Sequence, residues 1–342
     1  MDGKKKWLAA FGLTVATGLA GMAALVAWID PFFQYHKPLK WFPYLIENQL
    51  CQNPGIAKQF EYDSVLLGSS MTVNFNTLWF EEYFGLNTVK LTYNAARPLD
   101  QDTILEVIEK YHGEVEAVFL GVDVTTYSRP VDERAYELQT YLYDDNLLND
   151  VNYWWNKDVL LNYVLEPFCL KKEMDDIHTL YNKWYDPGQF SAPKVLESYS
   201  PSKGIGGDLD NVTRNMEEHI LPYIREHRDT QWYVFFPPYS ILFWHSALQE
   251  GEVDARLAEY RTIVEALLEC DNVQVYFFAN DADIICNLDN YSDYTHYSRE
   301  VSLYVTRCMA EGKKRLTPEN YEEELEKLKA LAEGFDFGIW GL

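Results

Sequence analysis

The sequence lacks the patterns that mark several common classes of protein. Its five cysteines contain no Cys-x-x-Cys pair or other zinc-type spacing, so a metal site has no support and a dense disulfide framework is excluded. That count leaves room for one or two bridges, with at least one thiol unpaired unless chains cross-link. Basic residues are few, 29 against 53 acidic ones, for a net charge of −24. An acidic chain of this kind has no reason to bind nucleic acid.

Glycine-rich phosphate sites are missing as well. The glycine-rich loop at residues 201–207 is not followed by the Gly-Lys-Ser/Thr of a phosphate-binding loop. We expect no cofactor, and we find no internal repeat or low-complexity tail. Aromatic residues, in contrast, are abundant, with 25 tyrosines and 10 tryptophans. This composition suits a packed core and argues against disorder.

The acidic balance also bears on the substrate. A strongly negative domain repels anionic lipid and polyanionic wall polymer, although salt limits the repulsion to about a Debye length. This favours a neutral or cationic substrate, unless the charge is only a solvated surface without functional meaning.

One long run without charge stands at the N-terminus. Lys4, Lys5 and Lys6 precede residues 7–29, which contain 23 residues and no charge. At about 1.5 Å per residue the run would span roughly 34 Å, enough for a bilayer core. The lysines predict that residues 1–6 stay in the cytoplasm and that the chain after residue 29 lies outside the cell membrane. A cleaved signal peptide is the alternative, but a secretory apolar core has only about 7–15 residues.

After the run, the pattern alternates between strand and helix. Short apolar stretches predict strands at residues 64–67, 87–93, 116–123, 231–236 and 273–278. Helical periodicity is found at residues 78–84, 104–111, 211–226, 254–269 and 318–334. This order predicts an α/β fold with a parallel sheet and right-handed crossovers.

The domain organisation follows from the same reading. The α/β core comprises residues 61–127 and 211–312, and residues 313–342 form a C-terminal helix and tail. Residues 30–60 are a juxtamembrane segment, in which four prolines argue against a long helix. Residues 128–210 are polar and aromatic, which predicts an insertion that caps the core.

A serine, a histidine and an aspartate have the spacing of a nucleophilic site. Ser70 follows the first predicted strand in Gly-Ser-Ser, and Asp293 and His296 follow the last one. A serine hydroxyl needs an imidazole to take its proton, and a carboxylate fixes the tautomer of that imidazole. Taken alone, Gly-Ser-Ser is equally typical of a helix N-cap. Asp289 is the alternative acid, and the other six histidines lack such a setting.

This arrangement resembles the SGNH (GDSL) hydrolase superfamily. The resemblance implies a flavodoxin-like three-layer sandwich in which Ser70 is the nucleophile, His296 the base and Asp293 its partner. It further implies an oxyanion hole from the N–H of Ser70 and from the block Tyr93-Asn94-Ala95-Ala96, where we expect Asn94 and Ala96, or Ala95, to contribute. The sequence departs from the family pattern at Ser69, where many members have Asp, at Ala95-Ala96, where the second block usually has glycine, and at Asp123, where many have Asn.

Those departures resemble a membrane-anchored branch akin to proteins that O-acetylate alginate or D-alanylate teichoic acid. The resemblance implies transfer or removal of an O-acyl group, most simply acetyl, on a cell-envelope glycan or wall polymer, with a multi-pass membrane O-acyltransferase as a partner. The alternatives are a hydrolytic esterase and a non-catalytic scaffold that binds glycan or recruits the acyltransferase. Tyr239 and Trp244, after a double proline, are expected to line the cleft, although core packing would explain Trp244 equally well and Tyr239 somewhat less well.

Overall fold

The computed structural model describes residues 3–181, 187–201 and 207–342. The chain divides into two compact units. One unit comprises residues 1–60 and 138–177, and the other comprises residues 61–137 and 178–342. We refer to them as the N-terminal unit and the α/β unit. Most of the glycine-rich loop noted above, residues 202–206, lies outside the described residues.

The α/β unit is built on a six-stranded sheet with the order β2-β1-β3-β4-β5-β6. The first five strands in that order are parallel, and β6 runs antiparallel to β5. The strands are β1 (Ser64–Leu67), β2 (Thr88–Lys90), β3 (Ala117–Gly121), β4 (Gln231–Phe236), β5 (Val273–Phe277) and β6 (Arg315–Leu316). The predicted α/β fold with a mostly parallel sheet is therefore confirmed.

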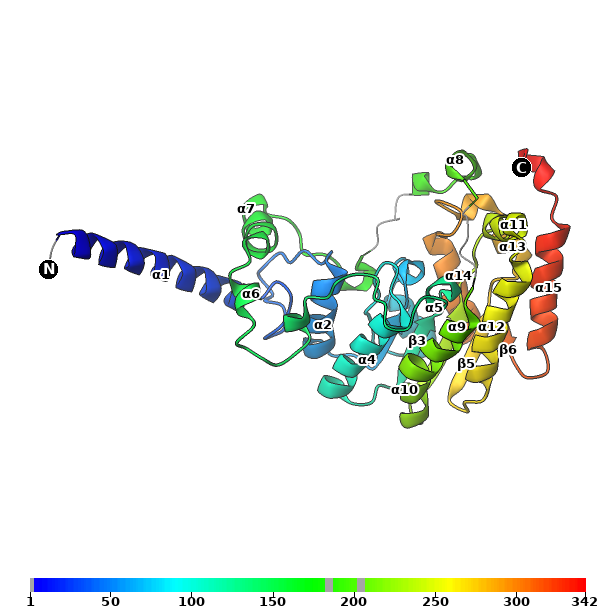
Figure 1. Ribbon diagram of the computed structural model, residues 1–342, viewed down its shortest axis with the longest axis horizontal. Coiled ribbons are helices and arrows are strands. Elements are labelled where there is room, and N and C mark those ends of the chain that lie inside the picture. Colours follow the sequence, from blue (N-terminus) through cyan, green and yellow to red (C-terminus); the bar gives the residue numbers. More distant parts are fainter. Residues whose placement is uncertain (1–2, 182–186, 202–206) are drawn as a thin grey trace. The chain divides into compact units, whose positions relative to one another are not determined.

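Helices cover both faces of this sheet. From β1 the chain moves to β2 on one side of the sheet, and it then returns past β1 to β3 on the other side. Because the crossovers are right-handed, α3 lies on one face and the later crossover helices lie on the other. α14 packs on α3, whereas α4 contacts η6 and α12 contacts α9 and α15 (Figure 1). These elements are α3 (Leu78–Phe84), α4 (Pro98–His112), α9 (Leu209–Asn215), η6 (Met216–Ile220), α10 (Leu221–Glu226), α12 (Val253–Leu268), α14 (Arg299–Ala310) and α15 (Tyr321–Gly334).

The local sequence explains the ends of these helices. Pro98 occupies the first turn of α4, where a missing N–H costs nothing, and Gly113 ends the helix in a positive-φ conformation. Between them, Ile104, Val107 and Ile108 are buried against the sheet side. The helix therefore starts six residues earlier than the apolar spacing alone predicted.

Shorter helices join these layers. They are η1 (Ser70–Thr72), α5 (Val124–Tyr127), η5 (Pro187–Gln189), α8 (Ala192–Ser198), α11 (Ile241–Glu250), α13 (Ala282–Ile285), η7 (Leu288–Asn290) and η8 (Phe337–Trp340), with η4 (Ile177–Thr179) at the boundary between the units. None of these short helices was predicted, and β6 was not predicted either. α11 is hidden in the sequence because a double proline precedes it, and β6 has only two residues, too few for a strand pattern.

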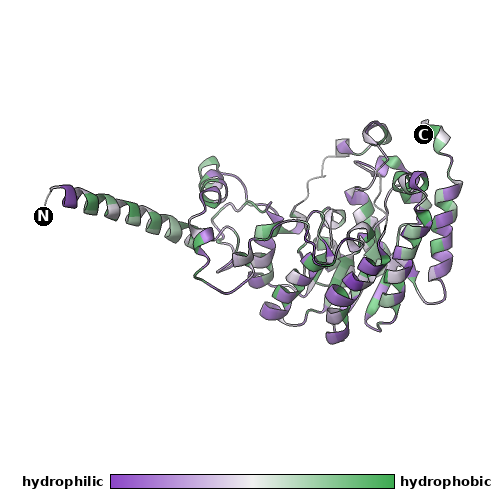
Figure 2. Ribbon diagram, in the orientation of Figure 1, coloured by the Kyte–Doolittle hydropathy of each residue, from purple (hydrophilic) through white to green (hydrophobic). Residues whose placement is uncertain are grey.

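In the N-terminal unit, α1 (Gly3–Ile29) is long and apolar (Figure 2). It is the one helix among the described residues that is long and apolar enough to cross a membrane, by length and composition. The remaining helices are α2 (Gln49–Gln59), η2 (Thr140–Leu142), α6 (Val151–Trp154), the π-helical η3 (Val159–Leu165) and α7 (Glu166–Leu170). The prolines of residues 30–60 do not prevent a helix there, since Pro54 lies inside α2, but they keep it short.

Aromatic and apolar side chains hold the N-terminal unit together. Its core gathers Val26, Phe32, Cys51, Leu142, Tyr153 and Val159. The rings of Phe32 and Tyr153 stack with their centroids 5.4 Å apart. The predicted insertion is thereby divided, because residues 138–177 group with residues 1–60, whereas the described residues from 178 onward group with the α/β unit.

Candidate active site

Ser70 lies at the point where β1 ends and a short helix begins. Ser69 caps this helix, since its hydroxyl accepts a hydrogen bond from the Met71 N–H at 3.3 Å. Gly68 has a φ of 147°, and a Cβ there would approach the Thr72 hydroxyl to 2.8 Å. The turn therefore requires glycine before the serines, and it leaves Ser70 partly exposed at the carboxyl edge of the sheet.

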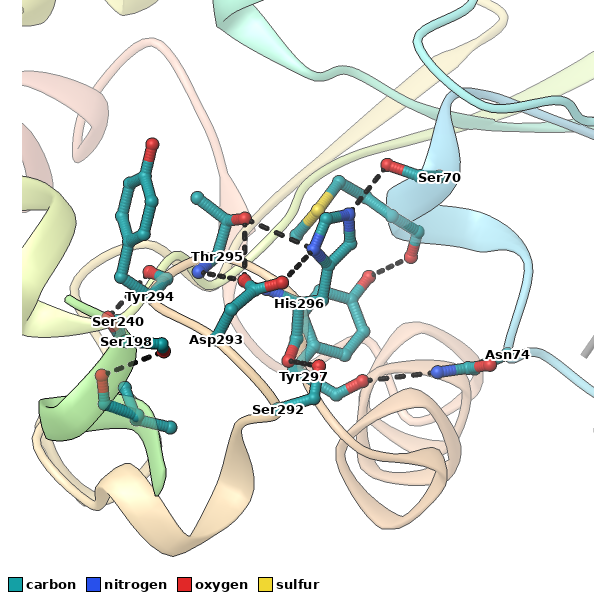
Figure 3. A network of polar contacts seen from close by, with 12 residues as sticks. Ser70, Asn74, Ser198, Ser240, Ser292, Asp293, Tyr294, Thr295, His296 and Tyr297 are labelled. Carbon is teal, nitrogen blue, oxygen red and sulfur yellow. Dashed lines mark hydrogen bonds and ion pairs between the residues drawn. The ribbon is translucent and has the colours of Figure 1, made fainter. Parts of the chain in front are cut away.

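The histidine loop after β5 brings a base to this serine. The Oγ atom of Ser70 lies 2.8 Å from Nε2 of His296, and Nδ1 of the same ring lies 2.7 Å from Oδ2 of Asp293 (Figure 3). When Nδ1 donates to the carboxylate, Nε2 is the acceptor that faces the hydroxyl. The three residues singled out by spacing thus lie in one hydrogen-bonded line, in the geometry that lets an imidazole activate a serine.

Asp293 is held as a carboxylate. Its Oδ1 atom accepts hydrogen bonds from the N–H of Thr295 at 2.8 Å and of His296 at 2.9 Å. Burial by itself raises the pKa of Asp293. The hydrogen bonds from His296 and from the Thr295 N–H, together with the charge of His296, outweigh burial and lower the pKa to about 2. Asp289, the alternative acid, instead accepts from the Ala192 N–H at 2.8 Å.

Tyr297 connects the histidine loop to the serine loop. Its hydroxyl donates to the carbonyl of Met71 at 2.6 Å, and its own carbonyl accepts from the Asn74 side chain at 3.3 Å. Ser240, after β4, donates to the carbonyl of Tyr294 at 2.6 Å. Tyr297 was not singled out from the sequence, because nothing in the local pattern reveals a partner more than 220 residues away.

Asp123, at the end of β3, receives three hydroxyl groups. Ser69 donates at 2.9 Å, Thr125 donates at 2.7 Å, and Tyr239 also donates. Burial, followed by the Asp123 charge, raises the pKa of Tyr239 above its usual range, so its hydroxyl stays protonated as a donor. Ser69 and Asp123, from the ends of neighbouring strands, are therefore hydrogen-bonded to each other.

The block after β2 forms a β-turn. The N–H of Ala96 donates to the carbonyl of Tyr93 at 3.2 Å, so it is already used. Ala95, with a φ of 56°, lines the same pocket as Ser70, whereas Asn94 and Ala96 do not. Among the described residues, none accepts a hydrogen bond from the N–H of Ser70 or of Ala95. Ala95, which we gave only as an alternative, thus replaces Asn94 and Ala96 as the oxyanion candidate.

A pocket of about 270 Å³ opens beside the serine. Its walls come from the carboxyl ends of successive strands, where a doubly wound sheet holds its ligands at the reversal of strand order. The pocket is lined by Ser70, Met71, Ala95, Arg97, Asp123, Thr125, Thr126, Arg129, Tyr239, Phe243, Tyr294, Thr295 and His296. A larger hollow of about 610 Å³ lies near the amino ends of β4 and β5, but its lining contains no nucleophile beside a base.

The two aromatic residues expected in the cleft behave differently. Tyr239 forms part of the pocket wall. Trp244 is fully buried in α11, where its ring lies 5.4 Å from Phe243 and 6.1 Å from Tyr260, centroid to centroid. Trp244 therefore packs in the core, as the alternative for this residue had it, and does not line the pocket.

Two arginines of the pocket, Arg97 and Arg129, were not singled out from the sequence. They follow β2 and β3, the strands next to β1, and their position after strand ends was the available signal. Comparison with known proteins adds no assignment, because no protein-family model matches this sequence and no curated protein matches it either.

Proposed function

We propose that this chain is a membrane-anchored serine acyl-enzyme of the SGNH type, which transfers or removes an O-acyl group, most simply acetyl, on a cell-envelope polysaccharide. One observation carries the proposal, the hydrogen-bonded line from Ser70 through His296 to Asp293. A structural N-cap needs a hydroxyl at the strand end, but it needs neither a histidine nor an aspartate beside it.

The reaction follows from the positions of these atoms. The Ser70 Oγ atom attacks the carbonyl carbon of an acyl ester while Nε2 of His296 takes the hydroxyl proton. His296 then returns that proton to the departing alkoxide, which leaves the acyl group on Ser70. In the second half, a glycan hydroxyl or water attacks the acyl-serine, gives its proton to Nε2, and Ser70 recovers the proton as the new ester or acid departs.

The developing oxyanion needs donors that face the pocket. The backbone N–H groups of Ser70 and Ala95 are available for this role, since both residues line the pocket and neither N–H has an acceptor among the described residues. Loss of one such donor typically costs about 10²–10³ in kcat. Asp123 is not a donor in this scheme, because its oxygens accept hydroxyl groups.

The SGNH assignment rests on the order of blocks along the chain and on their positions after strands. The serine block follows β1, the alanine turn follows β2, Asp123 follows β3 and the Asp/His loop follows β5. The hydrogen bond between Ser69 and Asp123 supports the assignment further, since it makes these two of the departures from the family pattern compatible with each other.

The cellular arrangement is part of the same proposal. α1 crosses the cell membrane once, with Lys4, Lys5 and Lys6 in the cytoplasm and the α/β unit outside. In that position the enzyme meets wall polymers and glycans, and a multi-pass O-acyltransferase in the same membrane is the expected acyl donor. The choice between transfer and hydrolysis depends on how well water is excluded from the acyl-serine.

A covalent adduct on Ser70 tests the proposal. The full chain, in detergent micelles, is incubated with an activated acetyl ester, and the acylated residue is located by mass spectrometry. We expect the acetyl group on Ser70 and its loss in both Ser70→Ala and His296→Ala, with ester turnover lower by roughly 10⁴–10⁶. Ser198→Ala, at a serine on α8 whose hydroxyl donates to the Val195 carbonyl, is the matched control and should keep full activity.

The rivals predict other outcomes of the same experiment. A hydrolytic esterase releases acetate even when a glycan oligosaccharide is offered as acceptor, whereas a transferase gives the acetylated oligosaccharide. A folded chain that binds glycan but never acylates Ser70 would establish the scaffold instead.

A further inference from the structure

The two arginines of the pocket are unexpected in so acidic a protein. Arg97 and Arg129 line the same pocket as Ser70 and His296, in a chain whose net charge is −24. Asp123 lies there too, but its oxygens already accept hydroxyl groups from its neighbours. The pocket therefore places two guanidinium groups beside the nucleophile, together with a carboxylate whose oxygens already have donors.

Arg129 has a fixed backbone and an available side chain. Its N–H donates to the Thr126 carbonyl at 3.4 Å, and its carbonyl accepts from the Asn215 amide at 2.8 Å. The side chain is exposed, and no carboxylate among the described residues forms an ion pair with it. A guanidinium on an anchored backbone, facing a pocket, is suited to bind a ligand.

Arg97 supports the same conclusion from the other wall. It is the N-cap residue of α4, a helix of 15 residues whose positive end adds to the charge there. Its side chain is 17% exposed and pairs with Glu133 at 2.6 Å, which holds the guanidinium in place. A guanidinium has five N–H donors, so this pair leaves donors for a ligand.

We propose that Arg97 and Arg129 bind an anionic group of the substrate, a carboxylate or a phosphate, next to the ester that Ser70 attacks. The proposal deepens the acyl-transfer function above and rests on it. The planar guanidinium matches carboxylate and phosphate with two parallel hydrogen bonds. Repulsion by the acidic surface fades within about 8–10 Å at ordinary salt, whereas these contacts are direct. Direct contact with the two arginines therefore outweighs the preference for neutral or cationic substrates that we expected from net charge.

Binding of matched ligands tests the arginines without relying on catalysis. Calorimetry on the full chain in micelles compares a galacturonic acid tetramer with its fully methyl-esterified form, in which a methyl group on each carboxyl group removes the charge. We expect the acid to bind about 10–100-fold more tightly, as expected for charge-assisted hydrogen bonds. Arg129→Gln should remove the difference. Arg228→Gln, which removes the same charge from an exposed site just before β4, should leave it unchanged.

The outcomes separate this inference from the proposed function. Equal affinity for acid and ester, or an unchanged preference in Arg129→Gln, overturns the anion site even if Ser70 is acylated. Arginine-dependent binding of the acid establishes the site even if no acyl-serine forms. Glycerol phosphate in place of the tetramer then decides whether phosphate or carboxylate is the preferred group.

A separate observation in the N-terminal unit carries a second inference. α7 and the residues around it expose large apolar side chains, which we call the apolar surface: Trp155, Leu161, Leu165, Phe168 and Leu170. Leu161, Leu165 and Phe168 are spaced by four and three residues, so they share one helix face. A soluble protein rarely exposes so many large apolar side chains close together.

The apolar surface is continuous with α1. α6 and η3 both contact α1, and Nε1 of Trp155 donates to the carbonyl of Leu19 at 3.1 Å. Leu19 lies about three helical turns before Ile29, roughly 15 Å along the helix axis. Residues 3–21 of α1 are exposed throughout, so the apolar surface adjoins the part of α1 that is available to lipid.

We infer that the apolar surface is inserted into the outer leaflet of the bilayer that α1 crosses. The anchor of this protein would then consist of a spanning helix and an interfacial helix.

Cys169, exposed on α7, reports on this insertion directly. The full chain with Cys270→Ser and Cys286→Ser is labelled there with a fluorescent dye and placed in lipid nanodiscs. We expect strong quenching by doxyl-labelled lipid and little by aqueous iodide. The same dye on Cys270, in a Cys169→Ser and Cys286→Ser chain, should respond to iodide instead. A Cys169 dye quenched by iodide alone, or shielded from both quenchers by another protein surface, overturns the inference.

Discussion

The two units each contain a carboxylate that accepts four hydrogen bonds, and the two carboxylates respond in opposite ways. In the N-terminal unit, Asp30 accepts from the N–H groups of residues 34, 35 and 36 and from the Tyr153 hydroxyl, at 2.7–3.1 Å. In the α/β unit, Asp293 accepts from Thr295 and His296 at 2.7–3.0 Å.

The pKa of Asp30 is raised, because its complete burial outweighs those bonds. The pKa of Asp293 falls to about 2, because its side chain is 38% exposed and one of its partners is an imidazole that can carry charge. The comparison teaches that the number of hydrogen bonds does not decide the state of a carboxylate. Burial and the charge of the partner decide it. Asp30 is suited to hold a chain together, and Asp293 to assist a base.

The largest effect is expected where Asp293 is changed. Asp293→Asn keeps the shape of the side chain but removes the charge and favours the wrong His296 tautomer, so kcat should fall by about 10⁴. Steady-state turnover of an activated ester measures this. Asp289→Asn is the control at the alternative acid, and an equal loss there would mean that the loop as a whole, and not Asp293, sets the rate.

The corresponding change in the N-terminal unit should affect stability alone. In Asp30→Asn, an amide N–H₂ group replaces one carboxylate oxygen and faces N–H donors that lose their acceptor. This loss should destabilise the N-terminal unit by about 2–4 kcal/mol. Hydrogen exchange resolved by segment measures it, with residues 30–60 losing protection. Turnover of a small soluble ester should stay within about twofold, because Asp30 has no role in the reaction. A tenfold loss would require the activation free energy to rise by about 1.4 kcal/mol. A larger loss of turnover would contradict the separate roles of the two carboxylates.

Tyr297 provides a smaller, more specific test within the α/β unit. Tyr297→Phe removes the hydroxyl that links the histidine loop to the Met71 carbonyl, so His296 should be less well placed. We expect kcat to fall by about tenfold with KM unchanged, because a misplaced base weakens the transition state and not the bound substrate. A rise in KM at constant kcat would instead assign Tyr297 to substrate binding.

The two carboxylates should also give opposite pH dependences of stability, and that of Asp293 should amount to about 1 kcal/mol after allowance for solvent screening. The lowered pKa of Asp293 stabilises the α/β unit above pH 3.8, and this contribution is lost as the pH falls through about 2. The raised pKa of Asp30 favours the folded N-terminal unit at low pH, and that contribution is lost as the pH rises above 3.8. Difference curves for Asp293→Asn and Asp30→Asn, from segment-resolved hydrogen exchange between pH 2 and 7, should therefore slope in opposite directions.

Much of the α/β unit could be predicted from the sequence, because its order is local and repeated. β1 and α3 begin and end where the apolar pattern predicted, at Ser64–Leu67 and Leu78–Phe84. Ser70, Asp293 and His296 were found because each follows a strand, and parallel strands bring their carboxyl ends to one edge. The short β6 and the helix α11 were missed, because two residues carry no periodicity and a double proline masked a helix start that Ser240 caps.

The N-terminal unit was predicted less well. The apolar run of α1 was evident, but the grouping of residues 138–177 with residues 1–60 was not. That grouping depends on contacts such as Tyr153 with Asp30, 123 residues apart, which leave no local trace. The same reason explains why Arg97 and Arg129 came to the site only with the structure.

The sequence by itself determined the apolar run at the N-terminus, the order of strands and helices, and the three residue types of a serine nucleophile, because these depend on neighbours a few positions apart. Only the tertiary structure decided that Ala95, and not Asn94 or Ala96, lines the pocket, that Trp244 is core, that two arginines stand beside Ser70, and that Asp30 and Asp293 differ. Those properties arise from burial and from contacts between distant segments, which a linear pattern does not contain.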